Sequence, residues 1–287
     1  MRQNPLAPRR IVVGVDASDS ALHAAIWAAR QAADLDVPLL VVHALDLGAT
    51  SVYSTAAGYT DERRDQGAAL LGKVARTLRE QVPEALVDTE LFEPSAPQTL
   101  VALSNESDLV VTGTRGHDGF AGLLLGSVSL KLAAHADGPV IVVRGDEPGA
   151  SDDEIVLGVE PQEDEAPIRF AFAMAAALGA MLTVVRAWWP HPAYGSYPED
   201  IMTADRDQAA QAEALISRLL DEYPDVKVSV SAMRGNAVPM LIEASRDARL
   251  LVVGAHRRRS PLSVGAGYVV QGLLSHSPTP VAVIPIM

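Results

Sequence analysis

A repeat within the chain is the feature that most constrains its fold. The spacing between the two copies is 144 residues at the first repeated segment and 141 at the later ones, so only short insertions separate them. The chain of 287 residues is therefore interpreted as a tandem duplication of one domain of roughly 140 residues. The repeated segments are RIVVGVD (10–16) and EIVLGVE (154–160), LVVTG (109–113) and LLVVG (250–254), and PVIVV (139–143) and PVAVI (280–284).

The repeat also sets the expected domain boundaries. We predict two domains, over residues 1–146 and 152–287. The segment GDEPGASDD (145–153) between them is rich in glycine, proline and acidic residues, a composition typical of a linker.

Short runs of Val, Ile and Leu alternate with longer Ala- and Leu-rich stretches at helical spacing in both copies. Unbroken apolar runs are typical of parallel strands that helices cover on both faces, so the pattern predicts an α/β fold with five strands per copy. The strands expected in the first copy are 11–15, 39–44, 86–92, 109–112 and 140–143. Helices are expected from Ser18 and over 61–81, 96–105, 127–136, 165–178, 204–222, 238–245 and before Pro280, the first of them with Leu22, Ala25, Ile26 and Ala29 on its buried face.

Composition excludes several classes of function. Negative charge is spread over both halves, with 12 basic and 19 acidic side chains in residues 1–148 and a net charge of -13 overall, so no basic half is available for nucleic acid. The absence of cysteine rules out disulfides, thiolate zinc sites and a cysteine nucleophile. The longest apolar stretch, 170–182, is too short to span a membrane, and the first ten residues have no apolar core. We expect a cytoplasmic protein without membrane or nucleic-acid partners.

One segment of the first copy could bind an anion. GTRG (113–116) ends the fourth predicted strand, and GSVS (126–129) begins the helix after it. Glycine lets the backbone approach a ligand closely, and free amides at a helix N-terminus favour a phosphate. The hydroxyl groups of Ser127 and Ser129 would add donors. The alternative is that these glycines merely end a strand and begin a helix.

The same residues carry a family resemblance. The spacing of Gly113, Gly116, Gly126 and Ser127, together with Gly-Val-Asp at the end of the first strand, resembles the ATP-binding form of the universal stress protein family. The resemblance extends over both copies, so the chain is similar to the tandem members of that family. It implies a doubly wound five-stranded parallel sheet in the order 3-2-1-4-5 for each copy.

That strand order predicts where a ligand would bind. Strands one and four would be neighbours, and open α/β sheets bind ligands beyond the carboxyl ends of their strands where the order reverses. Asp16 ends the first strand and Gly113 the fourth, so the two halves of the motif would meet in one crevice.

The resemblance also implies roles for single residues. ATP would be the ligand, with Asp16 beside the adenine amino group and the backbone of Ala44 facing the base. Mg²⁺ would bind mainly through the phosphates, since no acidic cluster is present in the motif. For Asp16 a helix N-cap is the alternative role. The remaining residues would be Thr112 and Gly113 at the ribose, and Gly116, Gly126, Ser127 and Val128 at the phosphates, with Ser129 as a further donor.

The second copy departs from this pattern. Glu160 replaces the aspartate, Arg257 the second glycine and Tyr268 the hydroxyl residue, although Gly267 is kept. A longer carboxylate would crowd adenine, so we expect this copy to bind nucleotide weakly or not at all. The run 257–259 (RRR) would fill part of the phosphate space, or else form a solvated basic loop.

Other candidate residues have simpler interpretations. Arg115 could pair with phosphate or be an exposed loop arginine, and His117 and Asp118 are interpreted as a solvated turn, because neighbours in a loop seldom face each other. His43 is expected to be half-buried at a strand end. No Walker loop, no GxGxxG after a strand and no Ser-His-acid arrangement is recognisable.

Two loops follow the second strands of the copies. The loop 46–60 is small and polar, as expected of a mobile lid. The loop 188–202 holds two Trp and two Tyr in a chain with 5% aromatic residues. We interpret it as packing that closes over an unused crevice, with a ligand or partner surface as the alternative.

These observations lead to a functional hypothesis. The chain is expected to be an ATP-binding stress-response protein in which nucleotide sets conformation, stability or the choice of an unidentified protein partner. The alternatives are a slow ATP hydrolase or adenylyl-transfer enzyme, and a nucleotide-free protein-interaction module. In this family the fifth strands pair antiparallel, which implies a pseudo-dimer within the chain or a homodimer.

Overall fold

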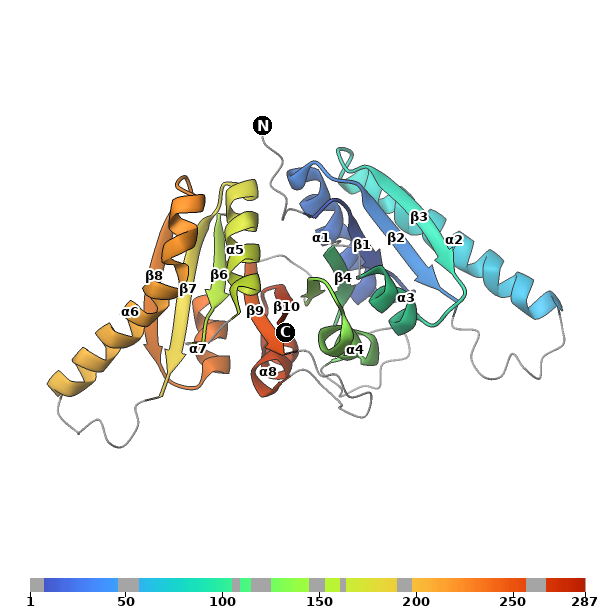
Figure 1. Ribbon diagram of the computed structural model, residues 1–287. Coiled ribbons are helices and arrows are strands. Elements are labelled where there is room, and N and C mark those ends of the chain that lie inside the picture. Colours follow the sequence, from blue (N-terminus) through green and yellow to red (C-terminus); the bar gives the residue numbers. More distant parts are fainter. Residues whose placement is uncertain are drawn as a thin grey trace. The chain divides into compact units, whose positions relative to one another are not determined.

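The computed structural model describes residues 8–45, 57–104, 109–114, 125–144, 153–160, 164–189, 198–256 and 267–286. These residues form two compact units, one of residues 8–144 and one of residues 153–286. Each unit contains five parallel strands with helices on both faces (Figure 1).

The sheet of the first unit has the strand order β3-β2-β1-β4-β5, with every neighbouring pair parallel. This is the order expected from the resemblance. Its elements are β1 (Ile11–Gly14), α1 (Asp19–Leu35), β2 (Leu39–Ala44), α2 (Ala57–Gln81), β3 (Val87–Phe92), α3 (Ala96–Leu103), β4 (Leu109–Gly113), α4 (Ser127–His135) and β5 (Val140–Val143).

The second unit repeats the arrangement, with the strand order β8-β7-β6-β9-β10 and parallel pairing throughout. The predicted α/β class and the doubly wound order are therefore confirmed in both copies. Its elements are β6 (Glu154–Gly158), α5 (Glu165–Leu178), β7 (Met181–Trp188), α6 (Pro198–Glu222), β8 (Val228–Arg234), α7 (Ala237–Ala244), β9 (Leu250–His256), α8 (Tyr268–His276) and β10 (Val281–Ile286).

The helices of each unit form two layers. In the first unit α1 and α2 contact each other and cover one face of the sheet, whereas α3 and α4 pack together on the other face (Figure 1). In the second unit α5 and α6 form one layer, and α7 and α8 form the other. Both faces are thus covered over the central strands, and this explains why Ile11, Val12 and Val13 are completely buried.

Helix α1 begins as the sequence predicts, and its buried face overlaps the expected one, because Ala25 and Ala29 are fully buried. Ser18 is its N-cap, and the helix ends at Asp36, which adopts the left-handed conformation with φ of 53°. Leu22 and Ile26, expected on the buried face, are only half-buried. The buried face consists of small residues that let the helix lie close to the sheet, with Trp27 beside them: Ala21, Ala24, Ala25, Ala28, Ala29 and Ala32.

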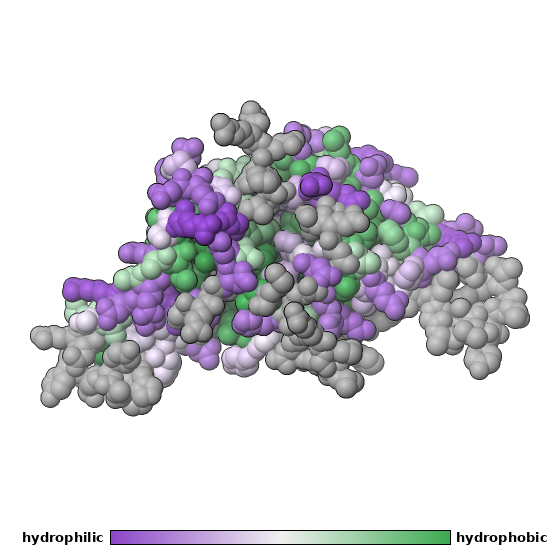
Figure 2. Space-filling view, viewed as in Figure 1, coloured by the Kyte–Doolittle hydropathy of each residue, from purple (hydrophilic) through white to green (hydrophobic). Residues whose placement is uncertain are grey.

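The two long helices start earlier than predicted. Helix α2 begins at Ala57, and α6 begins at Pro198, a residue that fits the first turn of a helix because its missing N–H has no partner there. Residues 61–66 of α2 are all exposed, and hydrophilic side chains dominate the surface of both helices (Figure 2).

Candidate functional site

The carboxyl ends of β1 and β4 lie side by side in the first unit. Ile11 pairs with Leu109 and Val13 with Val111, so the segment after β1 and the end of β4 share one edge of the sheet. The strand order reverses at this point, because β2 lies on the other side of β1 and β5 on the other side of β4. A crevice beyond this edge is the usual ligand site of an open α/β sheet.

Gly113 brings the first turn of α1 close to the end of β4. A Cβ atom added at Gly113 would lie 2.6 Å from Ser20 Oγ and 2.7 Å from the carbonyl oxygen of Ser20. Because backbone atoms make this contact, a side chain larger than hydrogen would force the helix away from the strand. Gly113 is buried, and Thr112 beside it is 6% exposed, with its hydroxyl donating to the Gly113 carbonyl at 3.3 Å.

Helix α4 is fastened to the end of β4 by two hydrogen bonds. The hydroxyl of Ser129 donates to the carbonyl oxygen of Gly113 at 2.7 Å, and the amide of Gly126 donates to the carbonyl oxygen of Thr114 at 2.6 Å. Ser129 is 2% exposed. Its hydroxyl hydrogen is directed at Gly113, so we revise the expected role of Ser129 from phosphate donor to structural anchor of the helix.

The first turn of α4 presents backbone amides without a side-chain cap. Gly126 is the N-cap, in an extended conformation with φ of -77° and ψ of 158°, and it has no side chain to accept from the turn. The amides of Ser127 and Val128 belong to the first turn, where no carbonyl of the helix itself is available to them. Ser127 is exposed and Val128 half-buried. Gly116, Arg115, His117 and Asp118 lie outside the described residues.

Asp16 is held at the same edge by the start of α1. Its Oδ1 atom accepts hydrogen bonds from the amide of Ser18 at 2.9 Å and from the Ser18 hydroxyl at 2.5 Å. The Ser18 hydroxyl in turn accepts from the amide of Ala21 at 3.2 Å, which makes Ser18 the N-cap. The alternative role of Asp16 as the N-cap is therefore wrong: its carboxylate positions the residue that caps the helix.

The backbone of Ala44 faces the strand that leads to Asp16. Val42 accepts through its carbonyl from the amide of Val15, whereas Leu45 donates from its amide to Phe92 on the other side. Backbone groups of successive strand residues alternate in direction, so the N–H and C=O of Ala44 point to the β1 side, as those of Val42 do. These groups lie beyond the last paired residue of β1, Gly14.

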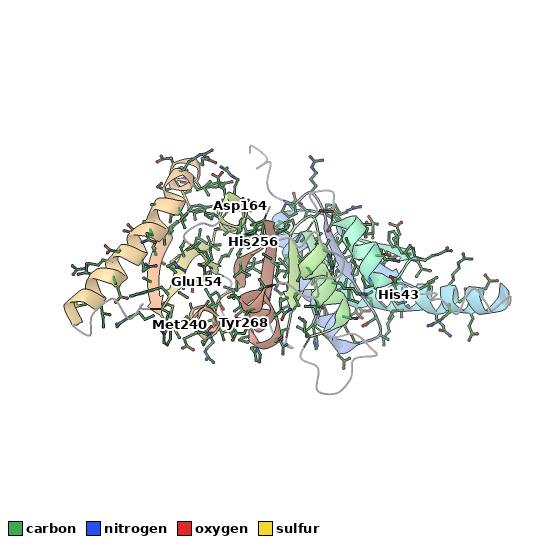
Figure 3. All side chains as sticks on the ribbon, turned by 60° about the horizontal axis from the view of Figure 1, so that its bottom comes forward. His43, Glu154, Asp164, Met240, His256 and Tyr268 are labelled. Carbon is green, nitrogen blue, oxygen red and sulfur yellow. The ribbon has the colours of Figure 1, made fainter. Side chains whose placement is uncertain are left out.

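His43 supports this edge without pointing to a catalytic role. Its Nδ1 atom lies 2.8 Å from the carbonyl oxygen of Val15, and because a carbonyl only accepts, Nδ1 carries the hydrogen. The ring lies beside α2 (Figure 3), where a Cβ added to Gly67 would be 3.1 Å from His43 Cδ2. The residue is half-buried at the end of β2, as the sequence predicts.

The second unit has an ion pair at the corresponding edge. Arg186 Nη1 donates to Glu160 Oε2 at 3.2 Å and to the carbonyl oxygen of Ala187 at 2.8 Å. Sequence reasoning identified Glu160 but missed Arg186. Comparing the second strands, LLVVHA in one copy and LTVVRA in the other, would have found it, because Arg186 takes the place of His43.

One further substitution of the second unit, Tyr268, lies at the start of α8. Gly267 is the N-cap of this helix, and Tyr268, its first residue, is 76% exposed (Figure 3). The arginine run 257–259 lies outside the described residues. Strand β9 continues to His256, two residues beyond Gly254, whereas β4 ends at Gly113.

The aromatic segment after β7 divides into a buried and an exposed part. Trp188 is 5% exposed, and its Nε1 donates to Asp205 Oδ1 on α6 at 3.1 Å. Trp189 is 75% exposed. Trp188 is therefore packed against α6, whereas Trp189 is exposed, and the expected closure over an unused crevice stays a prediction. Residues 46–56 and 190–197 of the two loops lie outside the described part of the chain.

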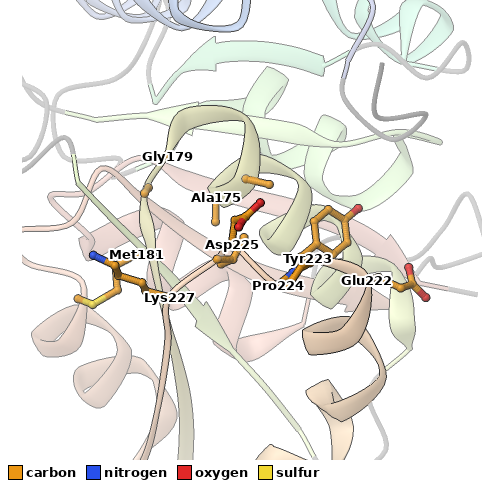
Figure 4. Close-up of a pocket in the computed structure, with 11 residues that line it drawn as sticks. Ala175, Gly179, Met181, Glu222, Tyr223, Pro224, Asp225 and Lys227 are labelled. Atoms are coloured by element: carbon orange, nitrogen blue, oxygen red, sulfur yellow. The ribbon is translucent and has the colours of Figure 1, made fainter. Parts of the chain in front are cut away.

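Features elsewhere in the described residues do not add a second site. No group of three or more His, Cys, Asp or Glu side chains in that part of the chain could hold a metal ion. None of its helices is both long and apolar enough to cross a membrane. A cavity of about 300 Å³ lies at the opposite edge of the second sheet, between the end of α5 and the turn after α6 (Figure 4); Gly179, Met181, Tyr223 and Asp225 are among its lining residues.

The fold and these two edges define a class of protein: a tandem pair of doubly wound α/β domains, each with the carboxyl ends of its first and fourth strands side by side. The model of the universal stress protein family matches residues 8–144 and 153–285. The chain belongs to this family.

Individual relatives agree over the whole chain. A universal stress protein of Mycolicibacterium smegmatis is 31% identical over 288 residues, which cover 96% of each chain. One of Mycobacterium tuberculosis is 29% identical over 290 residues, covering 97% of this chain and 98% of the relative. The crystal structure of a universal stress protein from Archaeoglobus fulgidus has the same fold, with a TM-score of 0.70 at 16% identity over 97% of this chain and 99% of that one.

Proposed function

We propose that the chain is a nucleotide-dependent regulatory protein whose first domain, residues 1–146, binds ATP. The second domain, residues 152–287, is proposed to be degenerate and to bind no adenine nucleotide. The observation that carries the proposal is the pairing of an uncapped first turn of α4 with the carboxylate of Asp16 at one edge of the first sheet.

The phosphates would bind at the first turn of α4. The amides of Ser127 and Val128 have no side-chain cap, and the helix dipole adds partial positive charge at the same place. The Ser127 hydroxyl is exposed and would supply a further donor, as would the backbone of Gly116 by the family resemblance. Gly126, whose amide donates to the Thr114 carbonyl, would line the phosphates through its close backbone approach. Mg²⁺ would be held through the phosphates.

The base would bind beside Asp16 and Ala44. A carboxylate accepts from an exocyclic amino group such as that of adenine, and the Ala44 backbone faces the same side. Because Asp16 is already oriented by Ser18, little side-chain entropy would be lost on binding. Thr112 and Gly113 are buried in this structure. Their proposed contact with the ribose therefore requires neighbouring groups to move aside when the nucleotide binds.

Regulation is favoured over turnover because the described residues around this edge supply no obvious base. His43 Nδ1 is directed at the Val15 carbonyl, and Asp16 Oδ1 accepts from Ser18. A ligand that binds only the native state raises stability by about 2.7 kcal/mol at a hundredfold excess over its Kd. We propose that this stabilisation, in the cytoplasm, sets the availability of the protein for a partner, with pairing of fifth strands within the chain or between two chains.

The test is direct. The purified chain is denatured and the released small molecules are identified by mass spectrometry, and thermal melts are recorded with and without ATP-magnesium at millimolar concentration. An adenine nucleotide at one equivalent per chain, or a clear rise in Tm with ATP, supports the proposal. No nucleotide and no shift with ATP, ADP or cyclic AMP would overturn it. Phosphate release at a steady rate would instead favour an enzyme.

A further inference from the structure

The second unit holds a guanidinium group at the place that corresponds to the proposed adenine site. Arg186 lies at the end of β7, and its Nη1 atom donates to Glu160 Oε2 and to the carbonyl oxygen of Ala187. The two acceptors belong to different segments, the one after β6 and the end of β7. One nitrogen therefore bridges the edge of the sheet.

Strand register shows which residues correspond in the two units. Gly14 pairs with Val42 in the first unit, and Gly158 pairs with Val185 in the second. The carbonyl of Val185 also accepts from Val159, as that of Val42 accepts from Val15. Counting one or two residues onward along each segment gives the corresponding pairs: Asp16 with Glu160, His43 with Arg186, and Ala44 with Ala187.

Arg186 thus donates to the two positions that are proposed to meet the adenine of the first unit. The carboxylate at the Asp16 position and the backbone carbonyl at the Ala44 position both accept from its Nη1 atom. In the first unit the corresponding side chain, His43, is directed at the carbonyl of Val15 instead. In the second unit, therefore, a side chain of the protein already donates to the carboxylate and the carbonyl at this edge. In the first unit, the corresponding side chain, His43, donates elsewhere.

Stability alone is a poor explanation for this pair. The Arg186 side chain is only 12% exposed, whereas that of Glu160 is 65% exposed. The Nε atom of Arg186 is buried with no hydrogen-bond partner among the described residues. Burying a guanidinium with one solvated carboxylate and an unsatisfied donor gives little net stabilisation, because desolvation opposes the attraction.

We propose that Arg186 is the residue that excludes adenine from the second domain, by occupying its acceptors from within. The proposal rests on the proposed function of the first domain. On this proposal the chain binds one nucleotide rather than two because Arg186 replaces His43, in addition to the changed glycines of the second copy.

The test places the arginine in the first domain of the full-length chain. His43→Arg would direct a guanidinium at Asp16 and the Ala44 carbonyl, while α4 stays unchanged. His43→Gln is the matched control, since it also removes the imidazole but brings no cation. We expect ATP affinity, measured by calorimetry, to fall at least about tenfold in His43→Arg and to stay within about threefold in His43→Gln. Circular dichroism and thermal melts show whether each variant is folded.

The outcomes separate the two proposals. If the unchanged chain binds no nucleotide, the proposed function fails. If it binds ATP and folded His43→Arg binds equally well, the inference about Arg186 is overturned. Should His43→Arg not fold, Arg186→Ala in the full-length chain is titrated with adenosine, which needs no phosphate contacts. A second binding event that the unchanged chain lacks supports the inference, and its absence to millimolar adenosine contradicts it.

Discussion

Ser129, buried in the first turn of α4, donates a hydrogen bond of 2.7 Å to the carbonyl oxygen of Gly113, the last residue of β4. This bond fixes the helix whose amides are proposed to bind phosphate. We expect Ser129→Ala to reduce the free energy of unfolding by about 1–3 kcal/mol, because a buried carbonyl loses its donor. Ser127→Ala, at an exposed position, should change it by less than about 0.5 kcal/mol. Urea denaturation measures both, and equal effects would contradict this role of Ser129.

The backbone amide of Ser127 can be removed selectively. Proline is favoured at the first position of a helix, and Gly126 before it is extended, with ψ of 158°, as a residue before proline prefers. Ser127→Pro should therefore fold normally and lose one phosphate donor. Ser127→Ala loses the same hydroxyl but keeps the amide. We expect ATP to bind about tenfold more weakly to the proline variant than to the alanine variant by calorimetry; equal affinities would show that this amide does not contact phosphate.

Asp16 is expected to combine two roles that substitution can separate. Asp16→Asn keeps an oxygen that accepts from Ser18 but removes the charge, whereas Asp16→Ala removes both. We predict that only Asp16→Ala lowers stability appreciably, by about 1 kcal/mol, since it disturbs the residue that caps α1. Retention of nucleotide should fall in both variants. Full occupancy in Asp16→Ala, measured by mass spectrometry after denaturation, would leave Asp16 with the structural role alone.

Two glycines should respond to alanine in opposite directions. A Cβ at Gly113 would lie within 2.8 Å of three atoms of Ser20, two of them backbone, so Gly113→Ala should destabilise the fold by about 1–3 kcal/mol. Gly72 lies within α2, and a Cβ there would meet nothing within 4 Å. Gly72→Ala should stabilise by about 0.5–1 kcal/mol, because alanine favours the helix. If the denaturation midpoints of both variants are higher, or both lower, than the midpoint of the unchanged chain, this packing is contradicted.

Acid should weaken the second unit through Glu222. Arg169 on α5 donates at 2.6 Å to Glu222 at the end of α6, and this hydrogen bond lowers the pKa of Glu222 from its ordinary value of 4.5. A carboxyl whose pKa is lower in the folded state stabilises the fold above its unfolded pKa. That contribution is lost as the pH falls through the folded pKa. Glu222→Gln should therefore reduce Tm at neutral pH and less so in acid.

A control on the same helix completes this experiment. Glu213→Gln removes an exposed carboxyl of α6, and we expect its Tm to follow that of the unchanged chain across the acid range. The difference caused by Glu222→Gln should also shrink at high salt, because exposed ion pairs are screened. A difference that is independent of pH and salt would indicate a packing effect instead.

The repeat and its apolar runs predicted the architecture because buried strands and covering helices leave strong periodic signals. The face of α1 was only partly predicted, since Ala24 and Ala28 are weak signals beside Leu22 and Ile26, yet their small size is what allows close packing on the sheet. Hydrogen bonds between distant segments leave no local pattern. The bond from Ser129 to Gly113 therefore required the structure, as did the two acceptors of Arg186, although comparing the copies would have singled out the residue itself.

The capping arrangement at the start of α1 has a mechanical consequence. The carboxylate that is proposed to meet the base also orients Ser18, and Ser18 caps a helix of 17 residues that runs the length of the sheet to Asp36 at the far edge. Any ligand that draws Asp16 outward would compete with the cap and fray the helix from its first turn. Ligand binding would then change how often the first turn of α1 opens. Amide hydrogen exchange along this helix would measure that change.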